Sequence, residues 1–229
     1  MGVALAGIAF RRNKEGFSPE DAVSRLFGKR VEVLQEPVDR SFDCRHDHGV
    51  LVQQYGNIWV ISNDSLTMPL LEDPQHDVRG LYETLDSPEL MICFCQYESG
   101  DCYGYAFIED GVLTRSRLQT SDLPLQQFGP LKAFERKWEA AEFYLDEDDC
   151  PQEEWQKIYY LGDREVTVME HFLTSRMTYE ALTEYMGVCP WDESITPQNL
   201  YFRLHDMPVQ QTQETVETSN KNKPWWRLW

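Results

Sequence analysis

The sequence lacks an apolar run long enough to cross a membrane, and it is short of positive charge. The apolar stretch at residues 3–10 is far too short for a membrane-spanning helix, which needs about 20 residues. Arg11 and Arg12 follow this stretch, whereas a signal peptide carries its basic residues first. Lysine and arginine number 21 against 39 acidic side chains, a formal charge of −18. Such a surface repels phosphates, so we expect a cytoplasmic protein that binds no nucleic acid.

Several sequence motifs of enzymes are also missing. There is no G-x-S-x-G elbow, Walker loop, dinucleotide-binding glycine pattern or H-E-x-x-H motif. None of the six cysteines belongs to a C-x-x-C pair, and we expect them to be reduced. Acidic pairs are frequent, but neighbouring carboxylates more often form a solvated surface than a catalytic pair, whose members come from separate elements. We therefore expect no cofactor, and a protein that binds rather than catalyses.

Turn sequences separate three strand-like runs in the middle of the chain. Glu98–Asp101 and Glu109–Gly111 are rich in glycine and acidic turn residues, and they divide residues 89–97, 102–108 and 112–119. This pattern predicts a three-stranded antiparallel meander. Apolar or alternating patterns predict further strands at residues 3–10, 30–34, 49–54, 57–62 and 155–161.

Helices are expected on both sides of the meander. Ser18 is a suitable N-cap, Pro19 suits the first helical position, and Gly28 suits the C-terminal end. Periodic apolar residues predict the other helices at residues 68–71, 78–85, 131–144, 165–173 and 178–186. The fold class predicted is therefore α+β: an antiparallel sheet with a three-stranded meander, flanked by helices.

The chain divides by composition into three parts. We expect a single α+β domain at residues 1–205, a polar linker at 206–222 and a tryptophan-rich motif at 223–229. Between residues 210 and 222 the single large apolar residue is Val216, which predicts a flexible C-terminal tail. The excess acid is concentrated within the domain, because residues 61–200 hold 28 acidic and nine basic side chains.

Two groups of residues are candidates for binding a partner. The first is the acidic run Asp146, Glu147, Asp148 and Asp149, which would attract a basic protein. The second is the C-terminal cluster, where tryptophans can dock on the protein's own domain, enter a partner's pocket or lie in a membrane interface. Its members are Trp225, Trp226, Arg227 and Trp229.

A further cluster has the chemistry of a metal site. In an extended chain Cys44, His46 and His48 would point to one face, and a thiolate with two imidazoles suits zinc. The other interpretation is a polar exposed loop. The metal interpretation predicts a metal-dependent or cysteine enzyme. The tryptophan motif supports another alternative, a membrane-peripheral adaptor held by its tail.

The remaining cysteines differ in expected exposure. Cys93 and Cys95 belong to the apolar run Leu90–Cys95, so we expect them to be buried and inert. Cys102 stands at a turn, where it would be more accessible.

The segment Tyr103-Gly-Tyr-Ala-Phe107 through Arg115-Ser-Arg117-Leu118 resembles a strand–turn–strand segment of uncharacterised bacterial domains of unknown function. Pro124-Leu125-Gln-Gln-Phe128-Gly129 and the helix before Gly187 extend the resemblance over about residues 50–190. The resemblance implies no activity and no site residue. Small acidic proteins of this general kind include immunity and adaptor proteins of bacterial toxin systems, which implies a protein that engages a basic partner through an acidic face.

Overall fold

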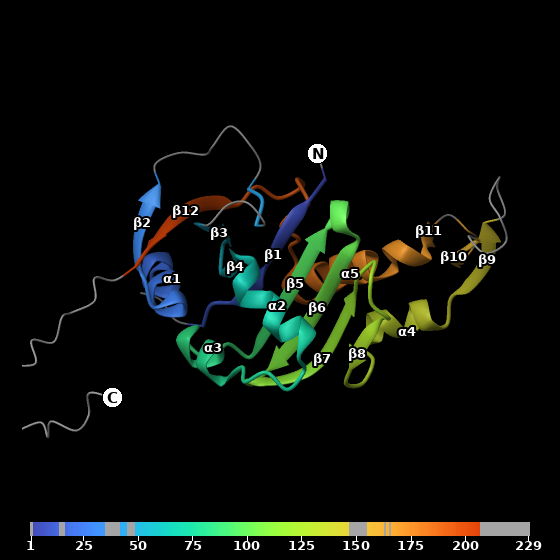
Figure 1. Cartoon of the computed structure of the whole chain (residues 1–229), viewed down its shortest axis with the longest axis horizontal. Helices are drawn as coiled ribbons and strands as arrows, with labels where there is room; N and C mark the ends of the chain where they lie inside the picture. The colour runs from blue at the N-terminus through green and yellow to red at the C-terminus, as the bar shows by residue number, and fades with distance from the viewer. Residues whose placement is uncertain are drawn as a thin grey trace, which may run out of the picture.

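Two antiparallel sheets organise the chain. The computed structural model describes residues 2–13, 17–34, 42–44, 49–146, 155–162, 164 and 166–206. The large sheet contains β1 (Ala4–Arg11), β2 (Arg30–Leu34), β3 (Gly49–Tyr55), β4 (Ile58–Ser62), β5 (Leu90–Tyr97), β6 (Cys102–Glu109), β7 (Val112–Gln119), β8 (Gln126–Phe128) and β12 (Gln198–His205). Its strand order is β2-β12-β3-β4-β1-β5-β6-β7-β8. The small sheet, at one end of the molecule, contains β9 (Glu142–Asp146), β10 (Gln156–Leu161) and β11 (Val166–Met169), with β10 in the middle (Figure 1). The predicted α+β class is confirmed.

Helices cover both faces at the centre of the large sheet. The helices are α1 (Pro19–Phe27), α2 (Asp64–Glu72), α3 (Arg79–Thr84), α4 (Ala133–Glu139) and α5 (Leu173–Met186), with 3₁₀ turns η1 (Glu98–Gly100) and η3 (Glu170–Phe172). Figure 1 shows α2 in front of the sheet and α5 behind it. Gln96 on β5 bonds Ser175 of α5 at 2.9 Å, whereas its neighbour Cys95 faces the α2 side, near Glu72. Covering on both faces explains why β5 and β6 are almost continuously buried.

Local signals place several elements where the sequence predicts them. Ser18 caps α1 by accepting a hydrogen bond from the Asp21 amide at 3.1 Å, and Gly28 ends the helix with a left-handed φ of 60°. Gly56, with φ 65°, turns β3 into β4. The predicted meander is confirmed as β5, β6 and β7.

Two predicted helices are wrong in part or in whole. The helix predicted at residues 131–144 ends at Glu139, and its last residues form β9 instead. The helix predicted at residues 165–173 is replaced by β11 and the turn η3. Pairing with β10 is the physical reason, since Phe143 and Val168 both lie opposite Tyr159. Strand β12, which joins β3 to β2, is not predicted by the sequence patterns.

The described part of the predicted domain, residues 1–205, contains both sheets. Because the linker and the tryptophan motif fall outside the described residues after Asp206, the division into domain, linker and motif stays a prediction. Among the described helices, none combines the length and the apolar composition that crossing a membrane would require.

Candidate protein-binding surface

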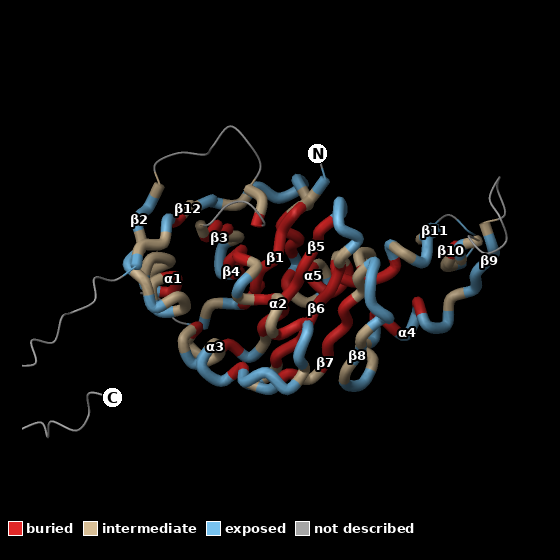
Figure 2. The backbone as a smooth tube through the Cα atoms, in the orientation of Figure 1, coloured by how far each residue is buried: buried red, intermediate tan, exposed pale blue. Residues whose placement is uncertain are grey.

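The small sheet exposes several large apolar side chains. Five of its residues are between 38% and 51% exposed. In Figure 2 the buried residues concentrate in the large sheet, while the small sheet is mostly of intermediate or exposed colour. Single exposed apolar residues are ordinary, whereas a cluster of them on one small element is a candidate interaction site. We call this cluster the β9–β11 surface; it consists of Phe143, Leu145 and Val166 on one face of the small sheet and of Tyr144 and Met169 on the other.

Strand register places apolar residues side by side on both faces of the small sheet. On one face Tyr144, Ile158 and Met169 lie opposite one another across the three strands. On the other face Phe143 pairs with Tyr159, with ring centroids 5.7 Å apart. Because directly paired residues share a face, each row is a continuous apolar strip rather than a scatter of single residues.

The edges of the small sheet are also open to a partner. β9 and β11 are its outer strands, and within the described residues neither pairs with a further strand. An outer strand presents backbone N–H and C=O groups that an extended segment of another protein can bond. The β9–β11 surface therefore offers apolar side chains and backbone pairing together.

The sequence that includes β9 and leads into β10 is strongly acidic. Residues 139–156 contain eight acidic side chains and no lysine or arginine. The two nearby cations are held on the sheet itself. The Lys157 ammonium pairs with Glu170 at 3.1 Å, and this hydrogen bond raises the lysine pKa. The Arg164 guanidinium lies 5.3 Å from the ring of Tyr144 and 4.8 Å from that of Tyr160.

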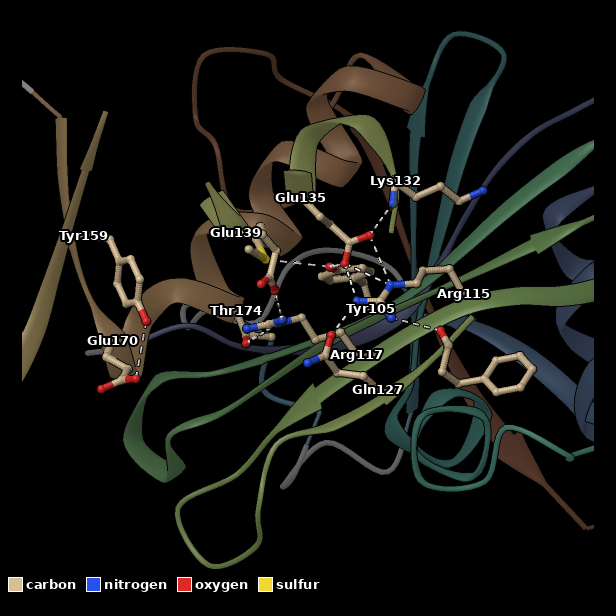
Figure 3. Close-up of polar contacts among 12 residues, drawn as sticks. Tyr105, Arg115, Arg117, Gln127, Lys132, Glu135, Glu139, Tyr159, Glu170 and Thr174 are labelled. Atoms are coloured by element: carbon tan, nitrogen blue, oxygen red, sulfur yellow. Dashed lines mark hydrogen bonds and ion pairs between the residues drawn. The ribbon is translucent and has the colours of Figure 1, made fainter. Parts of the chain in front are cut away.

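A buried ion pair anchors the helix that leads into the small sheet. Arg115 on β7 and Glu135 on α4 point toward each other in Figure 3, and their side chains are 2% and 0% exposed. The Arg115 Nε atom donates to both carboxylate oxygens, at 2.9 and 3.1 Å. The same carboxylate accepts from the Tyr105 hydroxyl and from the Lys132 amide at 2.6 Å. These contacts satisfy a charge that burial would otherwise make costly.

Further buried contacts tie α4 and β7 to α5. The Trp138 indole donates to Glu180 at 2.8 Å. The Arg117 Nε atom donates to Thr174 at 2.9 Å, and burial lowers the pKa of this guanidinium. α4 ends close to the start of β9, and η3 connects β11 to α5. The small sheet is thus held at both of its ends by the packed core, and these buried residues position it.

The predicted acidic site begins at the small sheet. Asp146 is the last residue of β9, opposite Gln156. Glu147, Asp148 and Asp149 continue directly from it in sequence and lie outside the described residues. The C-terminal candidates Trp225, Trp226, Arg227 and Trp229 lie outside them as well. Both groups stay predictions.

The predicted metal ligands are described in part. The Cys44 sulfur is buried, 3.3 Å from the Ala6 nitrogen and 3.4 Å from its carbonyl oxygen, and the Cys44 amide donates to Ala4 at 3.0 Å. His46 and His48 lie outside the described residues. Among the residues that are described, no three His, Cys, Asp or Glu side chains group around a possible metal position. The zinc site stays a prediction.

The other cysteines have the predicted difference in burial. Cys93 and Cys95 are fully buried on β5, and Cys102 is half-buried at the start of β6. The sulfurs of Cys95 and Cys102 are 3.9 Å apart. A hydrogen bond from Cys95 lowers the pKa of Cys102, whereas burial raises the pKa of Cys93.

These differences predict selective thiol chemistry. In native protein treated briefly with iodoacetamide, we expect Cys102 to be modified at least about tenfold faster than Cys93 or Cys95, because the thiolate is the reactive form and must be reached by the reagent. Peptide mass spectrometry measures the three rates. Protein unfolded in urea is the control, where the rates should converge. Equal rates in the native protein would contradict the buried position of β5.

Comparison with protein-family models, with curated proteins and with solved structures gives no match to this chain. The sequence patterns missed the β9–β11 surface because both of its outer strands were predicted as helix. The run Val166-Thr167-Val168 was the available signal, since β-branched residues favour strands.

Proposed function

We propose that this protein acts by binding another protein through the β9–β11 surface, and that the acidic residues beside this surface select a basic partner. The observation that supports the proposal is the joint presence of five exposed apolar side chains and ten acidic ones in residues 139–169. They belong to a sheet whose two outer strands pair with no further strand within the described residues. Protein interfaces combine an apolar centre with a polar rim, and opposite charge speeds their association. The protein would then be a non-enzymatic cytoplasmic adaptor or immunity-type protein.

The size of the small sheet limits what it contributes. Five residues along a strand span about 16 Å, and three strands span about 14 Å, so one face covers on the order of 230 Å². A stable interface buries about 800 Å² on each partner. The β9–β11 surface would therefore supply the centre of the interface, and the acidic segment with the open strand edges would supply its rim.

The test is affinity capture from the source cell, followed by measurement of the purified complex. The variant is Tyr144→Ser with Met169→Ser, which removes two exposed apolar groups from one face. We expect it to lose the partner that the unchanged protein captures, and we expect the affinity of the unchanged complex to fall as salt is raised. Val112→Ser is the matched control, because Val112 is 61% exposed on β7, far along the chain from the small sheet.

Two further variants separate the contributions of the acidic run and of the tryptophan motif to binding. Replacing Asp146–Asp149 with lysines should weaken the complex and remove most of its salt dependence. Deleting residues 223–229 reports whether the tryptophan motif also binds the partner. An identical partner and affinity for the unchanged protein, the serine double variant and the lysine variant would overturn the proposal.

A further inference from the structure

A second candidate site is a cavity of about 830 Å³ formed by β1, β3, β12 and the segment between α5 and β12. β12 and β3 lie toward the end of the large sheet opposite β8, next to which the small sheet projects, and β1 lies at the centre of the large sheet (Figure 1). Cavities that hold small molecules have volumes of about 300–1,000 Å³. The cavity is therefore large enough for a ligand and is separate from the β9–β11 surface.

The cavity exists because α5 covers the centre of the sheet and ends before reaching β3. After Gly187 the chain crosses over the sheet and enters β12. Trp191, on this crossing segment, packs against Phe94 with ring centroids 5.7 Å apart, which holds the wall in place. The floor is the sheet face that carries Gln53 and Tyr55, and Asn199 lies opposite Gln53 in the register.

Gln53 carries an unsatisfied acceptor at this floor. Its side chain lines the cavity and is 6% exposed, and its Oε1 atom has no hydrogen-bond partner among the described residues. A buried carbonyl oxygen without a partner is unfavourable, and such atoms in proteins nearly always find a donor. A ligand with an N–H group would supply that donor.

The walls favour a positive charge. The charged residues among the described lining are Asp43, Asp192 and Glu193, and no lysine or arginine lines the cavity in that part of the chain. The Asp192 carboxylate accepts hydrogen bonds from the Ser194 amide at 2.9 Å and from the Tyr179 hydroxyl at 3.1 Å, which lower its pKa and keep it ionised.

Aromatic rings complete the lining. Tyr55, Trp191 and Tyr201 all border the cavity. Burial, with the nearby Cys189 and Asp192, raises the pKa of Tyr55 to about 12, so its ring stays neutral. Neutral aromatic faces attract organic cations, and ammonium-binding sites commonly combine such rings with carboxylates.

We propose that this cavity binds an organic cation that carries N–H donors, namely a guanidinium or primary ammonium group. An N–H of the ligand bonds the Gln53 oxygen, while its charge is balanced by Asp192 and Glu193 and by the aromatic rings. The cation is either a free small molecule or a basic side chain of a peptide. This site goes beyond the proposed protein-binding function, because it uses other elements of the fold.

Calorimetric titration of the full-length protein with four probes tests the ligand chemistry. Agmatine has both the charge and the N–H donors, butylurea has the donors without the charge, and tetramethylammonium has the charge without the donors. Acetyl-Gly-Arg-Gly-amide presents the same guanidinium on a peptide. We expect saturable binding of agmatine, at least about tenfold tighter than that of butylurea or tetramethylammonium. Tighter binding of the peptide than of agmatine would indicate that the cation bound by this cavity is a basic side chain of a peptide.

Variants locate the site. Gln53→Leu removes the acceptor with little change in volume, and Glu193→Gln removes one charge from an exposed position. Each should weaken agmatine binding by about tenfold. Glu184→Gln is the control, because it makes the same charge change on an exposed part of α5 that does not line the cavity. Should Gln53→Leu fail to fold, Glu193→Gln against Glu184→Gln still decides the question.

Three results would overturn the inference: no saturable binding of agmatine or of the peptide, equal binding of tetramethylammonium, or equal affinity in Glu193→Gln and Glu184→Gln. The last result would mean that the cation is attracted by the overall negative charge alone. The double variant Tyr144→Ser with Met169→Ser should bind agmatine normally, which keeps this test separate from that of the proposed function.

Discussion

Replacing Glu135 with glutamine is expected to lower the free energy of unfolding by about 3–5 kcal/mol, because it leaves a buried arginine without its counter-ion. The Arg115 side chain is 2% exposed and cannot turn to water. Its other partners are neutral: the Gln127 side chain at 2.8 Å and the Phe128 and Gly129 carbonyls at 3.0 and 3.2 Å. Urea denaturation followed by circular dichroism measures the loss.

The control for this variant is Glu170→Gln, which removes the exposed ion pair with Lys157. Both of those side chains are well exposed, at 48% and 39%. Exposed ion pairs contribute about 0–1 kcal/mol, so the control should be close to the unchanged protein. If Glu135→Gln loses no more stability than Glu170→Gln, the buried pair is not what anchors α4, and the positioning of the small sheet needs another explanation.

Replacing Gly129 with alanine is expected to cost about 2–5 kcal/mol through backbone conflict. Gly129 has a φ of 76°, and a Cβ atom there would lie 2.0 Å from the Thr114 carbonyl oxygen. The left-handed backbone costs an alanine about 1–2 kcal/mol, and forcing atoms into a packed site adds about 1–3. Because Thr114 lies within β7, the strand itself would have to move. The Gly129 carbonyl also accepts from Arg115, so the same shift disturbs the buried pair.

Gly56→Ala is the matched control for this effect. Gly56 has a similar φ of 65°, but nothing lies within 4 Å of the position where its Cβ atom would be. The control therefore reports the backbone cost alone, about 1–2 kcal/mol. Equal losses for the two variants, measured by the same urea denaturation, would show that the contact with Thr114 relaxes easily and that β8 is not held tightly.

The two candidate sites follow from how the large sheet is covered. α2 and α5 cover its centre, whose residues are almost all buried. At one end, the chain between α4 and α5 forms the small sheet, where Tyr159 and Val168 pack against the core but Phe143, Tyr144 and Met169 stay exposed. Toward the other end, the segment after α5 crosses over β3 without filling the space beneath it. Each site therefore lies beyond the part of the large sheet that α2 and α5 cover.

Sequence patterns alone predict the elements whose signals are local. Ser18, Pro19 and Gly28 specify the ends of α1, and glycine with acidic residues at the turns specifies the meander, because capping and turn preferences depend on neighbours a few residues apart. By contrast, β9, β11 and β12 form because of pairing with strands that are distant in the chain or predicted separately. The helical spacing of Phe134 and Trp138 continues toward residue 144, and only pairing with β10 shows that the helix stops earlier.

Both candidate sites also depend on tertiary structure. The cavity is lined by Gln53, Trp191 and Tyr201. Gln53 is distant in the chain from the other two, so no local sequence pattern shows that these residues lie together. Likewise, Tyr144 and Met169 are exposed because little of the described structure packs on their side chains. The spacing of apolar residues in a sequence shows which face of a helix or strand is apolar. Whether that face is covered depends on how the helices pack on the sheet.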